Sequence, residues 1–203
     1  MTVKIYARLF LIGLLSLGPA AAEAGTMIAT GDAVVPPTGF IAFCVQHGQE
    51  CLVNAANPAP VELTAARRAE LDRVQADVNW QIKPREEPTH QWKYASDGYG
   101  DCNTYALTKR RTLIAIGWPE EDLLLAAVKD ELGEGHLVLV ARTTGGDLVL
   151  DNRLRPVIDW ASLPYHWISM QSQKSAARWL RVTGQPVVVA AARPVGSDSQ
   201  AHP

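Results

Sequence analysis

The sequence predicts one α+β domain, with helices early in the chain and an antiparallel sheet later. Apolar residues recur at three- and four-residue steps over residues 63–82, which is the period of an amphipathic helix. After Pro119 the pattern changes to short apolar or alternating runs separated by glycine, aspartate and proline. Composition agrees, because 47% of the 203 residues are hydrophobic and 20% are charged, as in a globular chain.

The amino-terminal residues have the pattern of a secretory signal peptide. Lys4 and Arg8 give a positive start, an apolar run covers residues 9–17, and small residues at A-x-A spacing follow. The apolar run is shorter than the ~20 residues that span a bilayer, so a membrane anchor is the weaker alternative. We expect residues 1–22 to be removed and the mature protein to be periplasmic or secreted, with no transmembrane segment.

The rest of the chain divides into three parts. Residues 23–60 are rich in Gly, Pro, Ala and Asn and are expected to form an irregular segment laid over the domain. Residues 61–192 are expected to form the compact domain, and residues 193–203 a disordered tail. The formal net charge of −2 argues against a basic groove for nucleic acid or a polybasic patch for membranes.

The cysteines become informative once export is assumed, because unpaired thiols are uncommon in an oxidising compartment. Cys44 and Cys51 flank a short stretch with Gly48 at its middle. They are predicted to form a disulfide that pins a local turn, with a metal or redox role as the alternative. Cys102 is then unpaired, which in an exported protein indicates an intermolecular bridge or a reactive group.

Two helices and four strands are expected in the domain. The amphipathic helix over 63–82 precedes a second helix over 103–116, which Gly117 and Pro119 stop. The basic run 109–111 is expected on the solvated face of this second helix. The strands are expected at residues 123–128, 136–142, 148–151 and 165–170.

Cys102 lies where the second helix begins. Gly100 and Asp101 precede it, so its sulfur is expected at the helix N-terminus, where unpaired N–H groups and the positive end of the helix dipole favour a thiolate. A thiolate is a nucleophile. The alternative is a buried, inert cysteine in the core.

A hairpin can bring an imidazole and a carboxylate to this thiol. His136 opens one predicted strand, Asp151 ends the next, and residue parity places both on one face. A tight turn at the Gly-Gly pair would set Asp151 opposite Val140, about 13 Å from His136. A loop over 143–146 would make Asp151 its diagonal neighbour, at roughly 7–8 Å, and we expect this longer or a bulged loop.

This arrangement predicts acyl transfer. Cys102 would be the nucleophile, His136 the base that takes its proton, and Asp151 the group that fixes the imidazole tautomer. The backbone N–H of Cys102 is a candidate oxyanion donor. The indole N–H of Trp92 is a second one, although packing is the alternative role for this side chain.

Four stretches carry a resemblance to a known family: DGYGDCNTYALTKR at 97–110, GWP at 117–119, GHLVL at 135–139 and LDN at 150–152. Together they resemble the bacterial transglutaminase-like cysteine peptidases, which include the LapG-like periplasmic proteases that release biofilm adhesins from the cell surface. The resemblance covers about residues 43–171. It implies a papain-like, transglutaminase-like fold in which the nucleophile helix packs on an antiparallel sheet.

One position departs from this family. Adhesin-cleaving members commonly carry an acidic pair directly after the cysteine and use it to hold calcium, whereas this chain has Asn103 and Thr104. Asp101 is the carboxylate that remains, and Ca²⁺ gains affinity from ligand charge. No cofactor is therefore expected to be required, and weak calcium binding at Asp101 and Asn103 is the alternative. The same departure weakens any transfer of adhesin specificity.

The sequence thus predicts an exported cysteine endopeptidase that forms a thioester with a protein substrate and releases it with water, a cell-surface protein being one candidate substrate. Acyl transfer to an amine, as in a transglutaminase or amidase, is one alternative. A catalytically silent periplasmic binding module is another. A regulatory or inhibitory protein partner is compatible with either activity.

Overall fold

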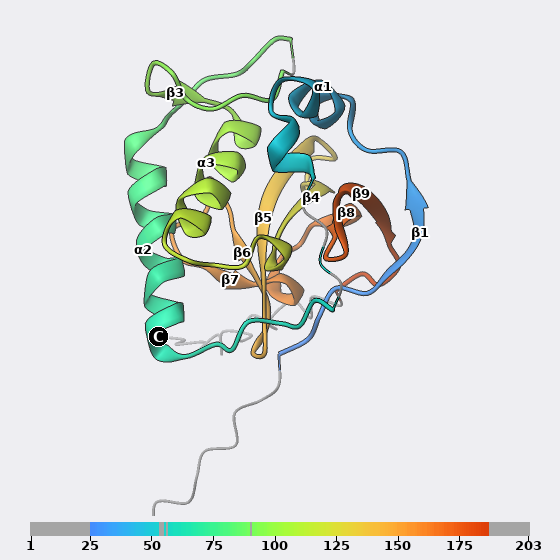
Figure 1. The fold of residues 1–203 in the computed structure, drawn as a ribbon. Helices are drawn as coiled ribbons and strands as arrows, with labels where there is room; N and C mark the ends of the chain where they lie inside the picture. The colour runs from blue at the N-terminus through green and yellow to red at the C-terminus, as the bar shows by residue number, and fades with distance from the viewer. Residues whose placement is uncertain (1–24, 53–54, 56, 90, 187–203) are drawn as a thin grey trace, which may run out of the picture.

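A seven-stranded sheet forms the centre of the computed structural model, which describes residues 25–52, 55, 57–89 and 91–186 (Figure 1). Its strand order is β1-β9-β8-β4-β5-β6-β7, and every neighbouring pair is antiparallel. The strands are β1 (Thr30–Val34), β4 (Leu123–Lys129), β5 (Gly135–Thr143), β6 (Gly146–Leu150), β7 (Ile158–Asp159), β8 (His166–Ser172) and β9 (Ser175–Val182). The predicted α+β class with an antiparallel sheet is confirmed.

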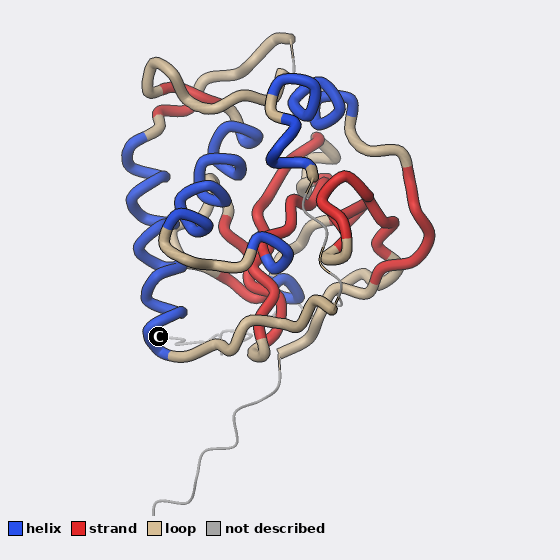
Figure 2. The backbone as a smooth tube through the Cα atoms, in the orientation of Figure 1, coloured by secondary structure: helices blue, strands red, loops and turns tan. Residues whose placement is uncertain are grey.

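Two long helices cover one face of this sheet, as Figure 2 shows in blue beside the red strands. They are α2 (Ala65–Gln81) and α3 (Cys102–Ala115). Leu137 and Leu139 of β5 face the helices, while Val138 and Val140 face a second buried cluster on the other side. Because β5 is buried on both faces, its sequence is a continuous apolar run rather than an alternating one.

Both helices begin and end where the sequence indicates. The Thr64 side chain accepts a hydrogen bond from the Arg67 N–H at 3.2 Å, which caps α2. The Asp101 carboxylate caps α3 in the same way, through the Thr104 N–H at 3.1 Å. The chain leaves α3 through Gly117, whose φ of 91° suits glycine.

The prediction of an irregular segment over 23–60 is wrong in its described part. This part contains β1, the helix α1 (Thr38–Gln46) and the short 3-10 helix η1 (Gly48–Cys51). β1 pairs with β9, which lies about 150 residues later in the chain, so local composition could not reveal it. A disulfide joins Cys44 to Cys51 and ties α1 to η1. The predicted signal peptide (1–22) and tail (193–203) lie outside the described residues.

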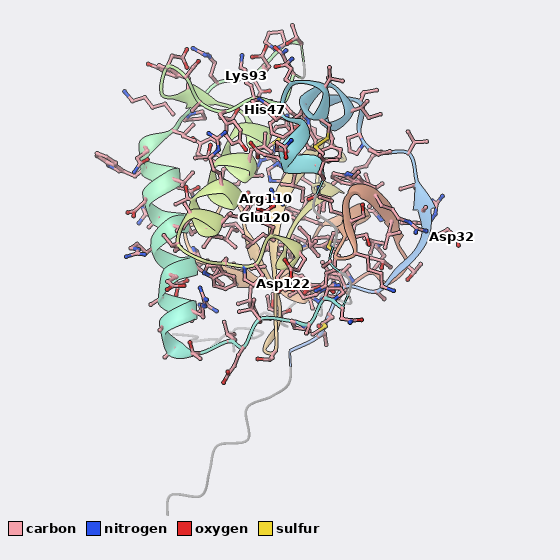
Figure 3. The ribbon with its side chains drawn as sticks, viewed as in Figure 1. Asp32, His47, Lys93, Arg110, Glu120 and Asp122 are labelled. Carbon is pink, nitrogen blue, oxygen red and sulfur yellow. A yellow bond between two sulfur atoms is a disulfide. The ribbon has the colours of Figure 1, made fainter. Side chains whose placement is uncertain are left out.

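The basic run of α3 is not a solvated face. Lys109 and Arg110 are buried, and only Arg111 is exposed. Arg110 donates through Nε to the Leu123 carbonyl at 3.0 Å and lies 3.6 Å from Glu120, and Figure 3 labels both residues of this ion pair. A helix packed between α2 and the sheet buries more of its surface than a simple amphipathic pattern predicts.

The β5–β6 hairpin has the register that brings its two ends together. Thr143 pairs with Gly146, so the turn contains two residues and is shorter than predicted. The register is nevertheless the predicted one. Leu139 pairs with Leu150, so the same register continued by one residue places Asp151 across from Val138 and diagonal to His136. Gly146 has φ of 103°, and a Cβ there would meet the backbone of residue 25 at 2.8 Å.

Four strands escaped the sequence analysis besides β1: β9, β7 and the short parallel pair of β2 (Lys83–Pro84) with β3 (Tyr99–Gly100). The β2–β3 pair lies directly before α3 and fixes the direction from which the chain enters it. Among the described residues, no helix is long and apolar enough to cross a membrane.

Candidate active site

Cys102 is the first residue of α3 and is partly buried, and its thiol is free. The chain reaches it through Gly100, where a Cβ would lie 2.4 Å from the Thr104 side chain, so glycine permits this close approach. Cys102 is therefore at the end of α3 that has unpaired N–H groups and the positive end of the helix dipole. This placement agrees with the sequence-based expectation.

His136 and Asp151 meet where β5 begins and β6 ends. The Nε2 atom of His136 lies 3.0 Å from Oδ1 of Asp151, and both side chains are inaccessible to solvent. Tyr165 donates its hydroxyl to Oδ2 of the same carboxylate at 2.6 Å, and the Arg153 N–H donates to Oδ1 at 2.8 Å. Both carboxylate oxygens are therefore paired, which is what a buried charge requires.

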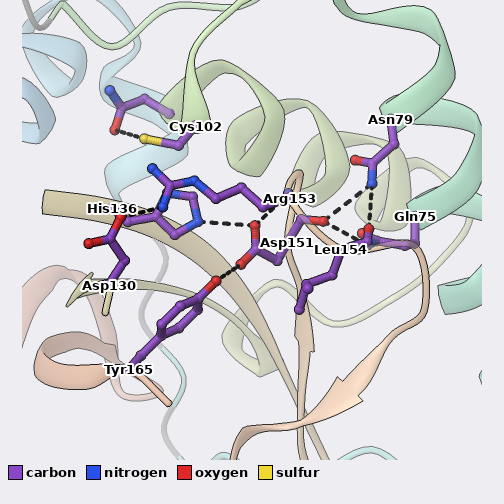
Figure 4. Close-up of polar contacts among 10 residues, drawn as sticks. Gln75, Asn79, Cys102, Asp130, His136, Asp151, Arg153, Leu154 and Tyr165 are labelled. Atoms are coloured by element: carbon purple, nitrogen blue, oxygen red, sulfur yellow. Dashed lines mark hydrogen bonds and ion pairs between the residues drawn. The ribbon is translucent and has the colours of Figure 1, made fainter. Parts of the chain in front are cut away.

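The imidazole lies between the thiol and the carboxylate, as Figure 4 shows. Its second nitrogen, Nδ1, is buried and makes no hydrogen bond to any described residue. The Cys102 Sγ instead lies 4.0 Å from the Asn103 Oδ1, a weak contact. The structure thus brings the three predicted residues into one cluster, with the thiol turned toward Asn103.

The pKa values of this cluster favour a charged pair. Burial lowers the pKa of His136, but the hydrogen bond to Asp151 and the neighbouring Cys102 outweigh it and raise that pKa to about 9. Burial raises the pKa of Asp151, but the bonds from His136, the Arg153 N–H and Tyr165 hold it below its usual range. The bond to Asp151 therefore stabilises the protonated imidazole, which is the form that His136 takes when it accepts a proton.

One cleft of about 460 Å³ borders this cluster. Cys102 and His136 line it, while Asp151 lies behind them. Trp92 also lines the cleft, and its ring packs edge-on against Phe40 and Trp179, at 5.7 and 6.2 Å between ring centroids. The indole of Trp92 therefore has the packing role that the sequence left as an alternative, and it also lines the cleft that Cys102 lines.

Asp101 and Asn103, the two candidate calcium ligands, bind each other. The amide of Asn103 donates to Oδ2 of Asp101 at 2.9 Å, while Oδ1 of Asp101 caps the helix. Within the described ranges, no group of three or more His, Cys, Asp or Glu side chains is arranged to hold a metal.

Sequence reasoning missed the side chains that surround Asp151. Tyr165 was expected only as a strand residue, and Gln75 and Asn79 only as positions of an amphipathic helix. An ion pair between Arg153 and Asp130 joins the turn after β6 to the β4–β5 turn. Gln75 and Asn79 come from a distant part of the chain, so no local pattern indicates their contact with Asp151.

Comparison with known proteins adds independent information. A family model described as "bacterial transglutaminase-like cysteine proteinase" matches residues 30–186. Solved structures of LapG from Legionella pneumophila are similar. One is 25% identical, with 55% of this chain and 67% of that chain covered and a TM-score of 0.47. The calcium-bound one is 22% identical, with 62% and 76% covered and a TM-score of 0.51, a likeness of fold. No protein with a curated description matches.

Proposed function

The chain belongs to the bacterial transglutaminase-like cysteine proteinases, and from this membership we propose that it is an exported endopeptidase with Cys102, His136 and Asp151 as its catalytic triad. The family match over residues 30–186 confirms the predicted family and the cysteine-peptidase class. The observation that carries the proposed triad is the hydrogen bond between the buried His136 and Asp151, made beside the free thiol of Cys102.

In the proposed reaction, the Cys102 side chain rotates away from Asn103 toward Nδ1 of His136. Asp151 holds the proton on Nε2, which leaves Nδ1 free to take the thiol proton. The thiolate attacks the substrate carbonyl, and the amine leaves with the proton that His136 returns. Water, activated by the same nitrogen, then attacks the thioester and regenerates the thiol.

Two N–H groups are proposed to stabilise the oxyanion of the tetrahedral intermediate. The backbone N–H of Cys102 is at the helix N-terminus, where it has no partner within the helix. The indole of Trp92 borders the same cleft and supplies the second donor. Preorganised donors of this kind contribute roughly 3–4 kcal/mol each in other acyl-transfer enzymes.

The proposed substrate is a protein segment, and the proposed location is the periplasm or the cell exterior. Support for export comes from the signal-peptide pattern over residues 1–22 and from the disulfide between Cys44 and Cys51. Exposed proteins of the cell surface are the substrates that such an enzyme can reach. A regulatory protein that covers the cleft would be compatible with this location.

Calcium is the ion to test, because one similar LapG structure is calcium-bound. Calcium prefers several oxygen ligands, whereas Asp101 contributes one carboxylate that is already engaged by Asn103 and by the cap of α3. The residues at this position do not fit a calcium ion, so no step of the proposed reaction involves one. Removal of calcium with EGTA should change kcat by less than about twofold. A large loss, restored by calcium, would contradict this.

The function is tested by comparing wild type and Cys102→Ala on surface proteins of the producing cell, in the presence of a labelled amine. We expect wild type to release fragments and to leave intact proteins unlabelled. Cys102→Ala should release no fragments and attach no label. Label in uncut chains would establish amine transfer instead of hydrolysis. Equal release by the Ala variant would show that Cys102 is not the nucleophile.

A further inference from the structure

Two amide side chains of α2 hold the main chain at Asp151. Nε2 of Gln75 donates to the carbonyl of Asp151 at 2.7 Å and to that of Leu154 at 2.8 Å. Nδ2 of Asn79, one helical turn later, donates to the same two carbonyls at 3.2 and 2.9 Å. Figure 4 shows both amides converging on this turn from the helix.

The turn needs this support because no strand provides it. β6 ends at Leu150 and β7 begins at Ile158, so the intervening residues lie outside the sheet ladder. A buried carbonyl without a partner is costly, and the two amides satisfy two carbonyls at once. Gln75 is 0% exposed, which is rare for glutamine and indicates that both donors of its amide serve this contact.

The amides and the imidazole act on opposite sides of one residue. The amides fix the backbone of Asp151, while His136 and Tyr165 contact its carboxylate. The His136 bond is 3.0 Å long and weakens steeply if the carboxylate moves or tilts. The α2 amides therefore hold the backbone from which the carboxylate that binds His136 extends.

We propose that Gln75 and Asn79 are positioning residues of the active site, which act on catalysis through Asp151. This inference rests on the proposed function, since it gives Asp151 its role toward His136. Neither amide lines the catalytic cleft, and neither contacts the reacting atoms. A displacement of about 1 Å in a catalytic group can cost on the order of 10²-fold in rate, so a contact behind the triad is able to control turnover.

The two carbonyls that both amides bind predict a specific pattern of effects in single and double variants. Because each amide binds both carbonyls, either one retains the turn when the other is removed. Single substitutions should therefore cost little, and the double substitution more than the product of the two. A purely structural effect on the helix would instead add in free energy.

The variants are Gln75→Met, which keeps the length of the side chain without its donors, Asn79→Ala, and the double variant. Asp77→Ala, on the exposed face of α2, is the control. We expect about a 3-fold loss of kcat in each single variant and about 30-fold or more in the double variant, with KM within about 2-fold. The control should match wild type.

A second measurement reports the pKa of His136. The rate of Cys102 alkylation by iodoacetamide is expected to change near pH 9, where His136 loses its proton. The bond to Asp151 raises the pKa of His136, so a displaced carboxylate should move this change in rate to lower pH. Thermal unfolding confirms that each variant is folded at the assay temperature. A folded double variant with wild-type kcat and alkylation profile would overturn this inference and leave the proposed function intact. Full activity of Cys102→Ala would instead overturn the proposed function.

Discussion

Two buried ionisable groups, Asp151 in the turn after β6 and Lys109 in the middle of α3, are treated differently by the fold. Asp151 accepts hydrogen bonds from His136, Tyr165 and the Arg153 N–H, and its pKa stays below the usual range. The Lys109 ammonium is 0% exposed and has no hydrogen-bond partner among the described residues. Burial lowers its pKa to about 7, although the charge of Asp151 opposes this.

This contrast shows that partners, more than depth, decide whether a buried charge is stable. The fold provides the turn at Asp151 with side chains from the segment before β8, from α2 and from the β4–β5 turn. It provides Lys109 with the face of the Tyr105 ring, whose centroid is 5.8 Å from the ammonium. Removing a partnered charge should therefore harm the protein, and removing the unpartnered one should help it.

The largest effect is expected from Asp151→Asn. The substitution keeps the size of the side chain but lets the imidazole adopt the wrong tautomer, so kcat should fall on the order of 10²–10⁴-fold. Steady-state kinetics on the variant measures this, with the exposed Asp77→Asn as the control. A loss below threefold in a folded variant would remove Asp151 from the proposed triad.

Lys109→Met is expected to stabilise the protein. Replacing an unpartnered buried charge with an apolar side chain of similar length should raise the free energy of unfolding at pH 6 by about 1–4 kcal/mol. Denaturant unfolding measures this, and Lys174→Met, at an exposed position, should change little. A less stable Lys109→Met protein would show that Lys109 has a partner in solution.

The stability difference between Lys109→Met and wild type should depend on pH. The pKa of Lys109 is about 7 in the folded chain and ordinary, near 10.5, in the unfolded chain. Between these values only the unfolded chain binds the proton, so wild-type stability rises with pH relative to the Met variant. The advantage of Lys109→Met should therefore be full below pH 7 and shrink toward pH 10. A constant difference would contradict the lowered pKa.

A smaller effect is expected from Tyr165→Phe. The variant removes one of several hydrogen bonds to Asp151, and such bonds contribute about 1 kcal/mol, or roughly 5-fold in kcat. Tyr99→Phe, at a partly exposed position, is the control. Equal kcat for Tyr165→Phe and wild type would show that the remaining partners suffice to hold the carboxylate.

The sequence predicts the positions of Cys102, His136 and Asp151 better than it predicts the residues around them. The start of a helix at Cys102 and residue parity across the β5–β6 hairpin are local properties, and the structure has both. Residues whose roles depend on distant contacts were missed or wrongly described. β1 needs β9 to become a strand, Tyr165 needs Asp151, and Lys109 is buried because α2 packs against α3.

The most direct test of the proposed triad is the rate of Cys102 alkylation by iodoacetamide between pH 5 and pH 10, in wild type and His136→Gln. We expect fast alkylation of wild type at pH 6–8, a change in rate near pH 9 where His136 loses its proton, and slow alkylation of the variant throughout the neutral range. Superimposable profiles would show that His136 does not activate the thiol, and would contradict the proposed triad.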